Sequence, residues 1–448
     1  MLQVLRNRTF RSLFTAQLVA LIGTGLATVA LALLAYDLAG NEAGAVLGTA
    51  LAIKMAVYVL LAPLSGALVP PSLRKRVLVA LDLVRAAVAL ALPFVDQIWQ
   101  IYVLIALLQS ASAGFTPLFQ SLIPEVLEDE RDYTRALSLS RMAYDLESLF
   151  SPALAAALLT LVSFHGLFAG TAAGFVVSAL LVLGTAFPAS SPSTNAAAPF
   201  EKARRGMRIY LRTPRLRGLL ALNLCAASGG AMVFVNTVVI VREVLGGGEA
   251  QVAYALAAFG GGSMLMALLL PRLLERWSER RFMLLAAIGM VTALLATTIL
   301  WWWRDGFSTW TPILLAWAAL GICYAGLVTP GGRLLRRSAR AEDLPFLFAA
   351  QFSLSHLCWL LAYPLAGWLG ATLGLGVALA ALSALALVAC ALAFLLWRGD
   401  ARGALAHRHD DLPDDHPHLR EYEADQAHAH SHEFFIDANH PRWPKAGQ

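Results

Sequence analysis

Long stretches without a single charged residue constrain this chain more than any other feature of its sequence. Residues 12–36 and 97–124 contain no Asp, Glu, Lys or Arg, and residues 148–200 and 344–397 are each uncharged over a length that accommodates two helices. A helix that crosses the hydrocarbon core of a bilayer needs about 20 mainly apolar residues. We therefore expect the bilayer to be the solvent for most of the chain.

Six further runs bring the expected number of membrane helices to twelve. Two of them carry isolated charges: one covers roughly 44–69 and contains Lys54, and the other covers roughly 77–95. Only 14% of the residues are charged and the mean hydropathy is +0.65, whereas a soluble domain carries about 25% charge. This composition excludes a soluble globular protein, a disordered chain and a nucleic-acid-binding protein. The uncharged runs are 218–241, 250–271, 282–303 and 306–332.

The basic residues of the connections fall almost entirely on one side of the expected bundle. Clusters at 202–217, 272–281 and 333–340 all follow even-numbered spans, whereas the loops on the other side carry only Arg242 and Arg304. Cytoplasmic loops of membrane proteins are enriched in Lys and Arg, so this asymmetry predicts the orientation. We expect both termini in the cytoplasm, which agrees with an even number of spans.

A polar segment divides the chain into two halves of six spans. Residues 188–217 begin in a Pro/Ser-rich stretch and turn basic, which indicates a cytoplasmic linker. We therefore predict an all-α membrane protein with twelve transmembrane helices in two pseudo-symmetric six-helix bundles. The bundles cover residues 1–187 and 218–397, and residues 398–448 form a tail.

Equivalent loops of the two halves share a pattern that resembles the signature of the major facilitator superfamily. That signature contains Gly, an acidic residue, Arg, Gly and a basic pair. The second half matches it well, whereas in the first half Pro70-Pro71 replace the acidic and basic residues. The matching residues are Gly66, Arg74, Lys75 and Arg76 in the first half, and Glu275, Arg276, Arg280 and Arg281 in the second.

The resemblance extends to one branch of that superfamily. The segment 117–125 is similar to the drug and siderophore efflux branch, and the whole chain resembles bacterial nickel-resistance exporters, which also end in a histidine-rich cytoplasmic tail. The resemblance implies a major facilitator fold in the bacterial inner membrane. It also implies a substrate site between the halves near the bilayer midplane.

Ionisable residues at membrane depth are costly and therefore mark candidate functional positions. Asp82 and Arg85 lie three residues apart on one helical face, which is typical of a structural ion pair. Lys54 lies near the midplane and needs a carboxylate partner at similar depth, for which Glu147 or Asp145 would serve. Two interpretations of Lys54 remain open, a gating or proton-linked residue and one member of a static buried pair.

Other polar residues have two interpretations each. Arg141 lies four residues before Asp145 on one face, and the two either line a cavity or form a structural pair. Asp37 ends the first span and is either functional or a hydrated helix end. A set of uncharged polar residues either lines the same cavity or joins helices by hydrogen bonds. This set is Gln17, Thr24, Gln109, Asn223 and Asn236.

His356 is the sharpest candidate for chemistry within the membrane. It lies near the middle of the eleventh expected span, close to Gln351, Ser353 and Cys358. Imidazole titrates near neutrality and binds nickel, copper, zinc and iron. The alternative is a histidine that forms a hydrogen bond with a neighbouring helix.

The tail predicts metal binding by its composition. In 428–433 three histidines alternate with small residues and precede Glu433, a set that suits Ni²⁺, Co²⁺, Zn²⁺ or Cu²⁺. Four prolines predict a largely disordered segment, and the apolar residues of 433–444 suggest docking onto the transporter. The alternative is a solvated tail with incidental histidines. Of the ten histidines, the tail holds His407, His409, His416, His418, His428, His430, His432 and His440.

Two functions follow from these features. The sequence contains no phosphate-binding loop and no nucleophile–base pair at recognisable spacing, so we expect neither an enzyme nor a cofactor. The first hypothesis is a proton-coupled exporter of nickel, with cobalt as a second substrate, in which Asp145, Glu147 and His356 bind ion and proton in competition. The second is an exporter of small organic molecules such as drugs, macrolides or siderophores. Either would act as a monomer, with lipid, substrate and protons as partners.

Overall fold

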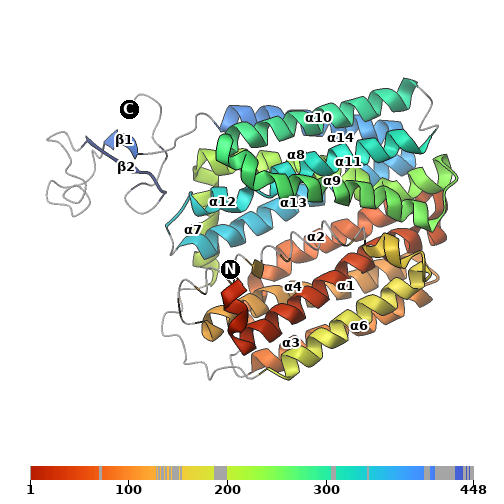
Figure 1. Cartoon of the computed structure of the whole chain (residues 1–448), viewed down its shortest axis with the longest axis horizontal. Coiled ribbons are helices and arrows are strands. Elements are labelled where there is room, and N and C mark those ends of the chain that lie inside the picture. The colour runs from red at the N-terminus through yellow and green to blue at the C-terminus, as the bar shows by residue number, and fades with distance from the viewer. Residues whose placement is uncertain are drawn as a thin grey trace.

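Almost all of the described chain is helical. The computed structural model describes residues 2–69, 73–127, 129, 132, 136, 139–140, 143, 151, 154–185, 199–303, 309–340, 343–397, 404–408, 429–436, 440 and 443. The long helices run side by side, with the N-terminal ones in red to yellow and the C-terminal ones in green to blue (Figure 1). We call the end of this body at which α1 begins the N-terminal side.

The N-terminal half supplies five long helices to the described part of the chain. Its predicted fifth span falls partly on residues outside the description, and residues 154–158 of it are helical. The elements are η1 (Leu2–Arg6), α1 (Arg8–Ala39), η2 (Gly40–Glu42), α2 (Ala43–Leu68), α3 (Arg74–Ala91), η4 (Leu92–Phe94), α4 (Ile98–Val126) and α6 (Phe164–Leu183).

The linker contains a helix that the sequence analysis does not anticipate, α7 (Pro199–Arg212), and only Thr213 separates it from the next span. A π-helical turn and a short helix, α12, interrupt the second half. Its elements are α8 (Pro214–Val239), η5 (Ile240–Val244), α9 (Glu249–Arg276), α10 (Glu279–Trp303), α11 (Trp310–Val328), α12 (Gly331–Arg336), α13 (Leu344–Thr372) and α14 (Leu375–Leu396).

Length and surface both identify these helices as membrane spans. Ten segments of the described residues are long and apolar enough to cross a bilayer, and the first, Arg8–Leu61, contains α1 together with most of α2. Large apolar side chains also face outward, among them Leu180 (60% exposed) and Leu268 (68% exposed). Apolar surface of this extent is stable against lipid tails and is rare on soluble monomers.

Small residues allow the helices to approach closely. Lipid removes most of the hydrophobic driving force between helices, so association depends on close packing. Where α9 crosses α11, a Cβ added to Gly262 would lie 2.1 Å from the carbonyl oxygen of Ala318. A Cβ on Gly321 would lie 2.0 Å from that of Phe259. Only glycine fits at these positions.

The tail contains structure that the sequence analysis does not foresee. Strands β1 (Ala404–Arg408) and β2 (Ala429–Glu433) pair antiparallel, with His407 opposite His430. The chain beyond β2 then contacts the helical body, because Phe434 and Ile436 join its buried apolar cluster. The suggested docking of this segment therefore occurs, and the ring of Trp443 packs against Arg215 at the start of α8.

Replacing Gly262 by Ala should destabilise the protein by about 1–3 kcal/mol, because the added methyl group forces α9 away from α11. The melting temperature of the purified protein in detergent measures this effect. Gly261→Ala is the matched control: no atom lies within 4 Å of its added Cβ, so its melting temperature should stay unchanged or rise. An equal fall in both variants would contradict the close crossing.

Candidate functional site

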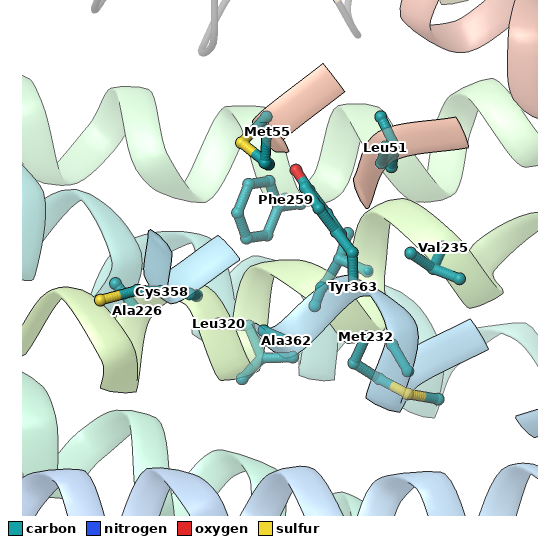
Figure 2. Close-up of a cluster of buried hydrophobic side chains, with 14 of the residues drawn as sticks. Leu51, Met55, Ala226, Met232, Val235, Phe259, Leu320, Cys358, Ala362 and Tyr363 are labelled. Carbon is teal, nitrogen blue, oxygen red and sulfur yellow. The ribbon is translucent and has the colours of Figure 1, made fainter. Parts of the chain in front are cut away.

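The two halves meet mainly where α2 packs along α13. Gly44 and Gly48 of α2 lie against Gly367 of α13, and a Cβ on Gly367 would lie 2.2 Å from the carbonyl oxygen of Gly44. Further along this contact, Leu51 and Met55 lie beside Phe259 and Tyr363 (Figure 2). The contact between halves is therefore close and apolar.

One face of α13 is aromatic in the middle of the helix. Phe352, His356, Trp359 and Tyr363 follow one another at spacings of four, three and four residues, which places them on a single helical face. Trp359 and Tyr363 have ring centroids 5.0 Å apart, and Phe352 and His356 have centroids 4.0 Å apart. We call these four rings, which form two contacting pairs along one face, the aromatic ladder.

The aromatic ladder of α13 continues onto neighbouring helices of the same half. Phe234 of α8 and Tyr324 of α11 each lie 6.1 Å from the ring of Trp359. Phe259 of α9 contacts both, at 5.3 Å from Phe234 and 5.4 Å from Tyr324. We call these rings, with Tyr363, the aromatic cluster. Trp359, Tyr324 and Phe234 are only partly buried, so this cluster presents accessible aromatic surface.

His356 joins the two halves through a stacked ring. Its imidazole lies 5.3 Å from the ring of Tyr58 on α2, with an angle of 18° between the ring planes. Its Nδ1 lies 2.6 Å from the carbonyl oxygen of Phe352, one turn earlier. If Nδ1 donates this bond, Nε2 is the nitrogen that accepts a proton or binds a ligand. Lys54 is one turn from Tyr58 on the α13-facing side of α2 and is partly buried.

Asp82 and Arg85 form a buried ion pair within the N-terminal half. Ser178 of α6 donates a hydrogen bond of 2.7 Å to Asp82, and the guanidinium lies between the rings of Phe115 and Phe175, at 4.1 and 4.5 Å. The pair thus joins α3 to α4 and α6. All of its described contacts lie inside one half.

A second contact between halves closes the side opposite the N-terminal side. Tyr36, near the end of α1, donates a hydrogen bond to Glu243 in η5, and Arg242 lies 4.9 Å from the Tyr36 ring. The amide of Asn41, in its favourable orientation, donates to the same carboxylate at 2.8 Å. Glu243 therefore accepts hydrogen bonds from two residues of the other half. Asp37, beside this contact, is exposed at the helix end.

On the N-terminal side, the signature loop of the second half is organised by a carboxylate that the motif comparison misses. Glu279 at the start of α10 is buried and forms two ion pairs. Its Oε1 lies 2.8 Å from Nε of Arg333 and 2.7 Å from Nη1 of Arg337. Arg280 donates to the carbonyl oxygen of Trp397 at 2.7 Å, whereas Glu275 and Arg276 are exposed. In the first half Lys75 donates to the carbonyl oxygen of Thr185 at 2.8 Å.

Several buried amides lie at membrane depth. Asn236 donates to the carbonyl oxygen of Ala366 at 3.0 Å and so joins α8 to α13. Gln17 is 3% exposed, and both its side-chain polar atoms lack a hydrogen-bond partner. Gln109 and Asn223 each retain one unpaired atom. Asn236 therefore joins two helices through its Nδ2, and all four amides keep at least one unpaired polar atom.

Part of the predicted site falls outside the described residues. Arg141, Asp145 and Glu147 all do, as do His409, His416, His418 and His428. Within the described part of the chain, no group of three His, Cys, Asp or Glu residues is placed to hold a metal ion. The helical spacing of rings on α13 is visible in the sequence, but their partners on α2, α8, α9 and α11 are not.

The chain has two helical halves in a membrane, and the contact between them is aromatic with few polar residues. This is the arrangement of a membrane transporter and not of an enzyme. Sequence comparison agrees: the profile of the Major Facilitator Superfamily matches residues 13–305 and 219–424. The chain belongs to this superfamily.

A curated relative and several solved structures resemble the chain. The relative is the uncharacterized MFS-type transporter YfiS of Bacillus subtilis (strain 168), 26% identical over 225 residues, which are 48% of this chain and 52% of the relative. The match thus spans about half the length of that protein.

The solved structures are distant in sequence and close in fold. A bacterial homologue of the human lysosomal transporter Spinster, inward-facing and unoccupied, has a TM-score of 0.64 at 14% identity, covering 87% of this chain and 96% of its own. The nucleoside transporter NupG has a TM-score of 0.66 at 12% identity, covering 86% and 100%. At these identities the likeness establishes the fold alone, which is the two-bundle helical fold of this superfamily.

Arg85→Met should destabilise the protein by about 3–5 kcal/mol, because it leaves the Asp82 carboxylate buried without its partner. The double variant Asp82→Leu/Arg85→Met should recover most of this loss, since it removes both charges. Thermal unfolding of the purified proteins measures both effects, and transport by the double variant tests whether the pair is only structural. A folded double variant without transport would give the pair a functional role.

Proposed function

We propose that this chain is a secondary active exporter of small organic molecules with apolar or aromatic surface. The observation that supports this proposal is the aromatic cluster, which lies at the contact between the halves where superfamily members bind their substrates. Aromatic rings bind flat or cationic organic groups by stacking and by cation–π attraction. The described residues there supply rings and methionine in place of several fixed metal ligands.

An ion gradient drives this transport, and the proton is the coupling ion. His356 supports this assignment because its ring is partly buried, lies between the halves, and carries an imidazole that can gain and lose a proton. Protonation places a positive charge within the aromatic ladder, next to Tyr58, which weakens binding of a cationic substrate. Asp145 and Glu147 are further candidates for the same proton. The basic side of the bundle faces the cytoplasm of a bacterial cell, with both termini inside.

Nickel export is the second candidate, and the register of the tail favours it. Because β1 and β2 pair with His407 opposite His430, and His432 lies two residues beyond His430, the three positions share one face of the ribbon, although the described residues do not form a three-ligand metal group. Together with the other tail histidines they would collect Ni²⁺ or Co²⁺ as substrate for delivery to the membrane region. Glu433 and the other tail histidines would extend this reservoir.

Growth assays distinguish the two candidates. A strain that expresses the protein and a null strain are compared across nickel, cobalt, zinc and copper, and across a panel of aromatic drugs. The proposal predicts protection against drugs and none against metals. Protection against nickel alone would overturn it in favour of the second candidate.

Trp359→Ala should weaken transport of an aromatic substrate about tenfold or more, because stacking and burial on an indole contribute about 1.5–3 kcal/mol. Concentration dependence of transport in proteoliposomes measures the change in apparent affinity. Trp303→Ala is the control, since Trp303 is 84% exposed at the end of α10. If both substitutions changed the apparent affinity equally, the aromatic cluster would not be the substrate-binding site.

His356→Gln should flatten the pH dependence of transport, because the glutamine amide cannot take up the proton that an imidazole binds. Uptake into inverted vesicles at a series of pH values measures this profile. His165 is an exposed histidine in the first turn of α6, so His165→Gln should keep the pH profile of the unmodified protein. An unchanged profile in His356→Gln would assign the coupling proton to another group, such as Asp145 or Glu147.

A further inference from the structure

The linker helix α7 has two sharply different faces. Ile209 and Tyr210 are buried, whereas Arg204 and Arg208 are exposed. Arg212, one turn further, is exposed as well and completes a row at spacings of four residues. Successive members of such a row lie about 6 Å apart along the helix axis. We call Arg204, Arg208 and Arg212 the basic row.

The buried face of α7 is fixed to the start of α13. Tyr210 donates a hydrogen bond to Gln351, and burial raises the pKa of Tyr210, so the phenol keeps the proton it donates. Arg205 pairs with Asp343, with 3.0 Å between Nη2 and Oδ2. A Cβ added to Gly206 would lie 2.1 Å from the carbonyl oxygen of Phe346. These contacts prevent rotation of α7 and hold the basic row outward.

The position of α7 places this row at the edge of the membrane. Only Thr213 separates α7 from α8, which crosses the bilayer, and α7 lies at the N-terminal side of the body beside α13 (Figure 1). Arg217, exposed in the first turn of α8, adds a further positive charge. Leu211, 46% exposed, presents apolar surface next to the row. Glu201 is the one acidic residue of α7 itself, and it lies at the helix start.

This combination fits the phosphate groups of anionic lipids. One guanidinium group can bind two oxygens of a phosphate at once. Basic residues on an amphipathic helix at the membrane surface also attract anionic headgroups. An exposed leucine beside them fits the acyl boundary just below. We propose that the basic row of α7 binds anionic phospholipid headgroups and thereby holds α7 against α13, the helix that carries the aromatic ladder.

The test uses the full-length protein in nanodiscs of phosphatidylcholine, with and without phosphatidylglycerol. Native mass spectrometry measures retained lipid, and thermal unfolding measures the stabilisation by phosphatidylglycerol. The unmodified protein should retain phosphatidylglycerol in preference to phosphatidylcholine. Arg204→Gln/Arg208→Gln should weaken this preference about tenfold or more and lose the added stabilisation. In phosphatidylcholine alone, the unmodified protein and this variant should have the same melting temperature.

Arg272→Gln/Arg276→Gln is the matched control. These residues are an exposed pair at the same spacing on the same side, at the end of α9, so the variant removes the same charge. It should retain the preference for phosphatidylglycerol. An equal loss in both variants would overturn the proposal in favour of diffuse charge attraction. A lower melting temperature of the α7 variant in phosphatidylcholine alone would overturn it too, because the arginines would then act within the protein, for example on the acidic tail.

Discussion

Close contact between α2 and α13 is the interaction on which the arrangement of this transporter depends. In lipid, apolar side chains gain little by leaving the solvent, so helices associate where backbones can approach. Gly44, Gly48 and Gly367 provide that approach between the halves. The aromatic ladder and His356 lie along the same contact, so any rocking of one half against the other must change the surroundings of these rings.

The charged groups fall into two sets. One set forms ion pairs inside a single half, and the other joins the two halves. Asp82–Arg85 and Glu279 with its two arginines each lie within a single half, and the change of state can leave them intact. Glu243 differs, because its partners Tyr36 and Asn41 belong to the other half. Its exposed position lets water replace those bonds when the halves separate there. Breaking this contact would therefore cost little free energy.

The sequence predicts the spans well because a membrane helix is a local property. The uncharged runs, the basic connections and the loop at Glu275 are all visible along the chain, and the pair Asp82–Arg85 follows from a spacing of three. Contacts between distant segments are not visible. Nothing in the sequence couples Tyr58 to His356, and the motif places the carboxylate of the second loop four residues before Glu279. The pairing of His407 with His430 likewise depends on strand register.

Reversible locking of the contact between halves tests the account most directly. Thr49→Cys/Trp368→Cys, in a background where Cys225, Cys323, Cys358 and Cys390 are replaced by Ala, puts thiols on facing sides of α2 and α13, where the indole of Trp368 donates a hydrogen bond of 2.9 Å to Thr49, and it leaves the close-packed glycines in place. Transport of the compound found in the growth assays is then measured before oxidation, after oxidation and after reduction. The account predicts that oxidation stops transport and reduction restores it. Full transport by the cross-linked protein would contradict it.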